Sequence, residues 1–284
     1  MDIRAALVGT RPGATAYAQA LARLPASLVG MEGRIAALAI HPVKGLGPLR
    51  LERALVDAHG LVEPRTGLAD RSVMLAYRRP GASPEGDAYD AVSLSNRNEA
   101  ALALAATSLD EDALVVEAPG LAPLRLPPAS LAPQGGERIR VKLAYDGGPV
   151  LEGAVDEGPL AAWARDLLRA RPATRRFAPE DVVAVRPLPR HARLVADKHR
   201  AGEDALTLFG DGAHALVASA STLAWMNASL AQEGARAIPM TAFRPNVVLD
   251  GLPPNAEDLV READVLTEEG PVRVGDAVRV ASER

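Results

Sequence analysis

The 284-residue sequence contains no cysteine. Disulfide bonds, thiolate nucleophiles, and zinc, iron–sulfur or other metal sites held by cysteine are therefore excluded for these residues. The histidines do not supply a substitute, because none of their spacings matches a metal-ligand motif, and the pair His191 and His199 is only weakly suggestive. We expect no metal held by protein side chains alone.

Long apolar runs are also missing. No stretch approaches the roughly 20 residues that span a bilayer, and Arg4 and Arg11 interrupt the short apolar patch at the N-terminus, which argues against a secretory signal. With a net charge of −4 and a pI near 5.8, the chain has no footprint for nucleic acid. These features predict a cytoplasmic protein that contacts neither membrane nor nucleic acid.

Common nucleotide and hydrolase motifs are absent as well. The sequence has no P-loop, no Gly-x-Gly-x-x-Gly and no Gly-x-Ser-x-Gly. Walker-type nucleotide binding, a Rossmann cofactor and an α/β-hydrolase therefore have no support.

What the sequence does contain is a series of short β-type runs punctuated by glycine, proline and aspartate, as in an all-β or α+β barrel. Its 48% hydrophobic content and mean hydropathy of +0.02 are typical of a globular core. We predict an α+β fold that is predominantly β. The expected strands are Ile35–Ile40, Leu51–Val56, Ser72–Tyr77, Leu114–Glu117, Leu121–Leu126, Ile139–Leu143, Ala237–Leu249 and Val272–Val280. The expected helices are Ala14–Leu24, Asn98–Ala106, Pro159–Arg169 and Ser221–Ala231.

Three hydroxyls, Ser219, Ser221 and Thr222, lie at or just before the N-terminus of one expected helix. Free backbone N–H groups and the helix dipole favour an anion there, so these residues are a candidate phosphate seat. Taken alone, these hydroxyls are better explained by ordinary helix capping. Asn227, on the same helix, is either a further polar ligand or a satisfied buried amide.

Two cations follow or precede expected strands. Lys44 stands beside Gly45, at a turn where the backbone could approach a ligand closely, or it is a lysine of a hairpin loop. Arg71 follows Asp70 at a strand entrance, where such a pair is usually a structural ion pair.

The segment Arg244–Pro245–Asn246 leads into the apolar run Val247–Leu249. If this is one strand, its period of two places Arg244 and Asn246 on one face, where a guanidinium and an amide could grip an anion or a polar ring. A salt-bridged strand entrance is the alternative.

In this order the segments resemble the MOSC-domain family, which includes the C-terminal domain of molybdenum cofactor sulfurase and the amidoxime-reducing component. The N-terminal MOSC β-barrel pattern is matched by IAALAIHPVKG, GLADRSVMLAY, AVSLSNRNEAALALAA and DALVVEAPGLAPLRLP. The MOSC core pattern is matched by VDEGPLAAWARDLL, HALVASASTLAWMN, FRPNVVLDG and VRVGDAVRV. The resemblance implies an N-terminal extension at 1–32, an N-terminal β-barrel domain at 33–135 and a MOSC core at 136–284.

The resemblance also implies a ligand, the molybdenum cofactor, which is a phosphorylated pterin with a dithiolene. By position, Lys44 and Arg71 would approach the pterin or phosphate from the N-terminal domain. The hydroxyls of Ser219, Ser221 and Thr222 would seat the phosphate, with Asn227 nearby. Arg244 and Asn246 would contact the pyranopterin or phosphate side. The pyridoxal phosphate domain of full-length cofactor sulfurases has no counterpart in this chain.

Two departures from the family pattern affect this expectation. Gly45–Leu46 follow the lysine, and the cysteine that catalytic relatives carry beyond the last strand is missing, so the chain is either naturally shortened or truncated. Three hypotheses follow: a molybdenum oxidoreductase for N-hydroxylated compounds that takes electrons from a partner protein, a non-catalytic module that binds or senses a phosphorylated small molecule, and an interaction protein with a vestigial pocket.

Overall fold

The structure is a computed structural model in which two compact units are formed by Met1–Leu38 with Leu216–Arg284, and by Ala39–Ala215. We call them the terminal unit and the central unit. The structure describes residues 24–82, 88–96, 98–144, 148–171, 177–189, 193–195, 206–213, 215–266 and 270–283. Apart from Leu24, the helix expected near the N-terminus falls outside these residues.

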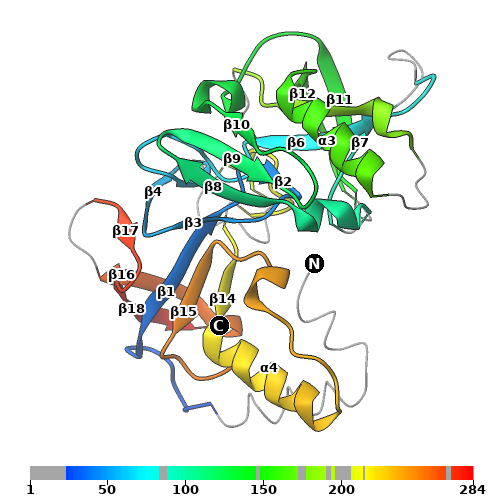
Figure 1. The fold of residues 1–284 in the computed structure, drawn as a ribbon. Coiled ribbons are helices and arrows are strands. Elements are labelled where there is room, and N and C mark those ends of the chain that lie inside the picture. The colour runs from blue at the N-terminus through cyan, green and yellow to red at the C-terminus, as the bar shows by residue number, and fades with distance from the viewer. Residues whose placement is uncertain are drawn as a thin grey trace. The chain divides into compact units, whose positions relative to one another are not determined.

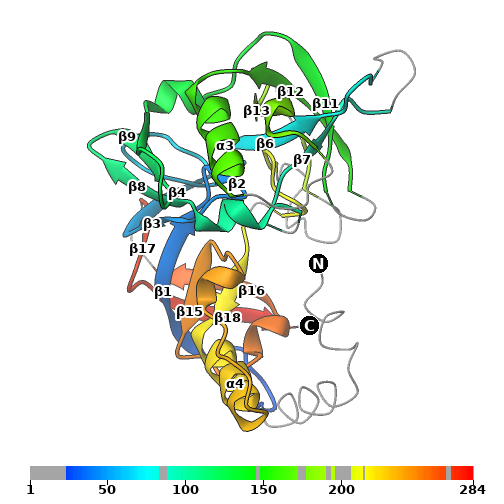
Figure 2. The same ribbon diagram turned by 45° about the vertical axis from the view of Figure 1, so that its right-hand side comes forward.

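A closed five-stranded β-barrel forms the core of the central unit. Its strands follow the order β13-β12-β11-β7-β6, and β13 pairs again with β6 to close the ring. The β7–β11 pair is parallel and the other pairs are antiparallel (Figures 1 and 2). The barrel strands are β6 (Val73–Arg78), β7 (Ala91–Ser93), β11 (Arg138–Lys142), β12 (Val150–Asp156) and β13 (Val182–Arg186). The boundary expected at residues 135/136 thus lies between strands of one barrel.

Apolar side chains fill the barrel. Met74, Val141, Val185 and Phe209 are buried in one cluster there, because alternate residues of each strand face inward. Gly153 of β12 leaves room for its neighbour strand, since a Cβ there would lie 2.4 Å from Val185 Cγ1.

The remaining elements of the central unit surround this core. Helix α3 (Pro159–Ala170), expected at Pro159–Arg169, begins with Pro159 after the cap residue Gly158, and its apolar stripe of Leu160, Trp163 and Leu167 is buried. It contacts β13 and β10. The other strands are β2 (Val43–Lys44), β3 (Leu49–Leu51), β4 (Arg53–Asp57), β5 (Gly60–Val62), β8 (Ala106–Asp110), β9 (Ala113–Glu117) and β10 (Leu124–Leu126). The 3-10 helices are η1 (Ala100–Leu104), η2 (Pro128–Leu131) and η3 (Pro179–Asp181).

The terminal unit is built on a twisted sheet of order β14-β15-β1-β18-β16. Strands β14 and β15 run parallel, and helix α4 between them contacts both, which makes a β–α–β unit (Figure 2). Its elements are β1 (Glu32–Ile40), β14 (Val217–Ser219), α4 (Ala220–Gln232), η5 (Met240–Ala242), β15 (Val247–Asp250), η6 (Ala256–Asp258), β16 (Val260–Leu266), β17 (Val272–Arg273) and β18 (Ala277–Glu283).

The predominantly β fold class is confirmed, with two α-helices among the described residues. The helix expected at Asn98–Ala106 is wrong in extent: only a 3-10 turn forms, since Ala105 is extended and β8 begins at Ala106. The strand expected from Ala237 to Leu249 is likewise reduced to β15. None of the described helices is long and apolar enough to cross a membrane.

Candidate binding site

Lys44 ends β2, which pairs in parallel with β6. Its side chain is only 7% exposed, and Nζ donates to the carbonyl of Phe209 at 2.9 Å and to the carboxylate of Asp211. Burial lowers the pKa of Lys44 from 10.5 to about 8, although Asp211 acts in the opposite direction. The lysine is therefore a buried group held by its own chain, and a hairpin-loop position is excluded.

Gly45 does allow a close approach, but the approach is to the protein itself. Its φ is 96°, and a Cβ there would lie 2.9 Å from Leu102 Cδ1. The predicted reason for this glycine, close contact with a ligand, is replaced by packing against η1.

Arg71 forms a buried ion pair with Asp70. The Asp70 carboxylate is 3% exposed, pairs with the guanidinium and accepts the backbone N–H of His41 at 2.7 Å. Burial alone would raise the pKa of Asp70, but Arg71 and His41 lower it to about 2. Arg71 also has a φ of 51°, in the left-handed region that costs a non-glycine residue about 1 kcal/mol.

A third cation completes this group. Arg193 donates from NH2 to the carbonyl of Asp211 at 3.0 Å and from NH1 to that of Gly210, so it and Lys44 hold the same loop. Both Arg71 and Arg193 lie near enough to Lys44 to lower its pKa further. The Asp211 side chain is 42% exposed, so its carboxylate reaches solvent. We call Lys44, Arg71, Arg193 and Asp211 the cation cluster.

Sequence reasoning missed Arg193 and Asp211. The only signal was the turn-type sequence Phe209–Gly210–Asp211–Gly212, in which an aspartate follows a buried aromatic residue. Its partner Lys44 lies 167 residues away in the chain.

At the N-terminus of α4, the hydroxyls already have protein partners. Ser219 is the N-cap, and its Oγ accepts the N–H of Thr222 at 3.3 Å. Thr222 Oγ1 donates to Glu257 Oε2 at 2.8 Å and accepts the N–H of Asn255 at 2.7 Å. Among the described residues, Ser221 is the one member of the predicted phosphate seat whose side chain makes no hydrogen bond.

Glu257 from η6 thus places a carboxylate at the helix end where a phosphate was expected. Burial raises the pKa of Glu257 above its ordinary value, against the opposing effect of the Thr222 hydrogen bond. Next to it, Asn255 is 1% exposed with a φ of 66°, and no described residue accepts a hydrogen bond from its Nδ2. Sequence reasoning missed both residues, although Glu257 begins an acidic pair, Glu257–Asp258.

The strand geometry expected for Arg244 and Asn246 is wrong. β15 begins at Val247, and Arg244 instead ends the turn after η5 with a φ of 57°. Asn246 is fully buried, and its Oδ1 accepts the N–H of Leu216 at 2.9 Å. The two side chains therefore do not share a strand face, and Asn246 joins the start of β15 to the segment before β14.

Asn227 has a structural position. Its amide group donates to the carbonyl of Ile238 at 3.0 Å and accepts the Ile238 N–H at 2.8 Å. This pair of bonds closes the loop after α4, as a satisfied amide does.

The predicted residues thus fall into two sets. Lys44 and Arg71 meet in the cation cluster of the central unit, and the other six lie in the terminal unit around the ends of α4, β14 and β15. No group of three or more metal-ligating side chains occurs in the part of the chain that the structure describes. His191, His199 and His214 lie outside that part.

Comparison with protein families gives two matches. The model of the MOSC N-terminal beta barrel domain matches residues 32–169, and the model of the MOSC domain matches residues 204–284. A comparison with curated proteins gives no match.

Proposed function

The chain belongs to the MOSC-domain family, with a MOSC N-terminal beta barrel domain ahead of its MOSC domain, and on this premise we propose that it binds the molybdenum cofactor through the organic part of that group. MOSC domains are associated with proteins that bind this cofactor. The ordered match of both domains is the observation that carries the proposal.

The backbone at two predicted ligand residues supports it. Arg71 and Arg244 both adopt left-handed φ angles, 51° and 57°, which are unfavourable for arginine. Residues in such conformations cluster at ligand sites, where the fold retains an unfavourable backbone because the side chain is needed in that place. Neither position is occupied by glycine, which would adopt the left-handed φ without the unfavourable energy.

The charge distribution supports the same ligand class. The three cations of the cation cluster face two carboxylates, Asp211 and the Asp70 that pairs with Arg71, so the group keeps one positive charge in excess that could attract an anion. Cations with rigid hydrogen-bond geometry are the usual partners of phosphate and of acidic ring atoms. Lys44, Arg71 and Arg193 are thus the residues of the central unit that would hold the anionic part.

Cations and amides are groups that a phosphate and a pterin edge can bind, but the 284 residues include no cysteine and therefore offer no thiolate for the metal. When bound, the cofactor would supply redox chemistry at molybdenum. The residues described above would bind and orient its organic part. Reduction of N-hydroxylated compounds with electrons from a partner protein is the activity that the family resemblance implies, and the binding proposal does not depend on it.

Substitutions at Arg244 test the proposal. Arg244→Ala and Arg244→Gly both remove the guanidinium, and we expect each to lower the pterin that co-purifies from a cofactor-producing host by about tenfold or more. Glycine accepts the left-handed φ, so Arg244→Gly should be about 1 kcal/mol more stable than Arg244→Ala. This pair separates loss of ligand from loss of fold. Arg279→Ala removes an exposed arginine that pairs with Glu32 and serves as the matched control.

Wild-type pterin content in both Arg244 variants would contradict the assignment of Arg244. An equal loss of pterin in Arg279→Ala would show that the loss follows the removal of any positive charge and not of Arg244 in particular. Turnover of N-hydroxylated substrates by the loaded protein would add catalysis to binding.

A further inference from the structure

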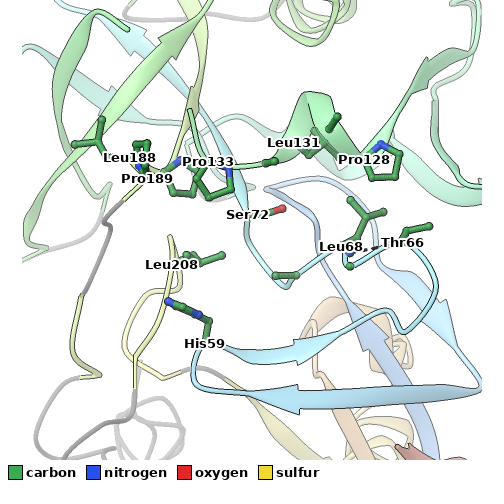
Figure 3. Close-up of a pocket in the computed structure, with 15 residues that line it drawn as sticks. His59, Thr66, Leu68, Ser72, Pro128, Leu131, Pro133, Leu188, Pro189 and Leu208 are labelled. Atoms are coloured by element: carbon green, nitrogen blue, oxygen red, sulfur yellow. Dashed lines mark hydrogen bonds between the residues drawn. The ribbon is translucent and has the colours of Figure 1, made fainter. Parts of the chain in front are cut away.

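A cavity of about 460 Å³ lies within the central unit, and none of the residues proposed above to hold the cofactor lines it, although Ser72 directly follows Arg71 in the chain. His59 from the β4–β5 turn and Leu68 from the turn before β6 line it. So do the segments 128–133, around η2, and 187–189, after β13. Figure 3 shows Leu131 and Pro133 on one side of the space, Leu208 and His59 on the other, and Ser72 between them.

The lining is mostly apolar, and its polar side chains among the described residues are those of His59, Thr66 and Ser72. Among the described residues that line it there is no lysine, arginine, aspartate or glutamate. Four of the lining residues are prolines, at positions 128, 133, 187 and 189, and most of the others are leucine or alanine. An ionised ligand would lose part of its hydration there without an oppositely charged partner among these residues, so we expect the cavity to disfavour phosphates and carboxylates.

Two polar side chains in the lining remain able to bind a ligand. Ser72 Oγ donates to the carbonyl of Pro42 at 3.2 Å, which leaves its lone pairs open to a donor. The His59 ring is 30% exposed and makes no hydrogen bond within the described chain, and its one ionic contact, to Asp57, is 4.0 Å long. The Thr66 hydroxyl is already committed to Glu63, at 2.7 Å.

The walls of the cavity are held in place before any ligand arrives. The N–H of Gln134 donates to the carbonyl of Pro187 at 3.0 Å, which joins the two proline-rich walls. The Glu63 carboxylate accepts the N–H groups of Arg65 and Thr66 at 3.0 and 2.7 Å, which fixes the turn that carries Leu68. Proline also restricts the backbone, so little conformational entropy is lost when a ligand binds.

From this combination we propose that the cavity is a binding site for a neutral, planar, mostly apolar small molecule that carries a hydroxyl or amino donor. The flat faces of proline rings pack well on aromatic rings, as in the recognition of proline-rich peptides. The volume equals that of about fifteen water molecules at about 30 Å³ each, which accommodates a bicyclic aromatic compound. The size and polarity agree with those of small-molecule pockets in general.

The experiment uses the full chain without cofactor and three related probes: naphthol, its methyl ether and its phosphate ester. Leucine methyl spectra are recorded during each titration, because Leu68, Leu131, Leu188 and Leu208 line the cavity and report its occupancy directly. Naphthol should shift these methyl signals selectively. The methyl ether lacks the donor and should bind about threefold to tenfold more weakly. The phosphate ester should bind about tenfold more weakly or not at all.

Two variants locate the site. Ser72→Ala should weaken naphthol binding about threefold to tenfold and leave the methyl ether unchanged. Ala132→Phe adds a ring to the lining and should abolish binding of both, whereas Ala162→Phe, on the exposed face of α3, should not.

The proposal is overturned if naphthol leaves the four leucine signals unmoved up to its solubility limit, or if it shifts leucines elsewhere. It is also overturned if the phosphate ester binds as tightly as naphthol. The cofactor proposal concerns other residues, so failure of either proposal leaves the other standing.

Discussion

The buried amine of Lys44 leads to a prediction about stability at alkaline pH. Lys44 is enclosed by β2, β6 and the loop at Asp211, and its pKa in the folded protein is about 8 against 10.5 for an exposed lysine. Above pH 8 the folded state has lost this proton while the unfolded state still holds it. The free energy of unfolding therefore rises with pH across this interval, by up to about 1.4 kcal/mol per pH unit.

The interval between about 8 and 10.5 corresponds to a gain of about 3 kcal/mol. Lys44→Met keeps most of the apolar stem and removes the titrating group, so this gain should vanish. At pH 7 the unfolding free energies of wild type and Lys44→Met should differ less than they do at pH 10.5. An apolar residue often replaces a buried charge at little cost when the partner of that charge can reach water, as Asp211 can.

Urea unfolding at several pH values between 7 and 10.5 measures the effect. The two tryptophans are Trp163, buried in the central unit, and Trp225, in the terminal unit. A Trp225→Phe background therefore makes fluorescence report the unit that contains Lys44. Lys142→Met is the control, since Lys142 on β11 contacts the ring of Tyr89 and not a buried carboxylate.

The reasoning is refuted if wild type and Lys44→Met keep a constant difference in unfolding free energy from pH 7 to 10.5. It is also refuted if Lys142→Met removes the same gain.

Three further predictions use the same unfolding assay. Asn246→Ala should lose about 1–3 kcal/mol, because it leaves the buried N–H of Leu216 without its acceptor; an unchanged midpoint would contradict the bond. As pH falls from 4 to 2, wild type should lose about 2 kcal/mol relative to Asp70→Asn, since the pKa of Asp70 beside Arg71 is about 2 when folded and 3.8 when exposed; equal acid sensitivity would refute this. Glu257→Gln should be more stable relative to wild type at pH 7 than at pH 4, because burial raises the pKa of Glu257 and the folded state holds its proton longer; the opposite order would exclude a raised pKa.

Local sequence signals predicted the elements that depend on local rules. Pro159 and the apolar stripe after it define α3, and α4 forms where a helix was expected from Ser221, although its N-cap is Ser219. Strands β12 and β13 were not predicted. Gly153 interrupts the alternation in β12, and its reason, the close approach of Val185, exists only once the barrel has closed.

The candidate site was less accessible to sequence reasoning, because its contacts join distant parts of the chain. Thr222 forms a hydrogen bond with Glu257, which lies 35 residues further along the chain. Lys44 forms one with Asp211, 167 residues away, and no local sequence pattern can indicate such a pair. The strand model failed at Arg244, since a left-handed residue after a 3-10 turn has no reliable sequence signal when it is not glycine. What the sequence did identify was the family pattern and the set of polar residues, and the structure gave most of those residues partners within the protein.

The most direct test of the central claim is the pterin and molybdenum content of the wild-type chain after purification from cells that make the cofactor. Pterin is measured by the fluorescence of its oxidised form and molybdenum by mass spectrometry. We expect stoichiometric pterin that is lost in Arg244→Gly, a variant expected to remain folded. Wild-type protein that is folded and carries neither pterin nor molybdenum would contradict it.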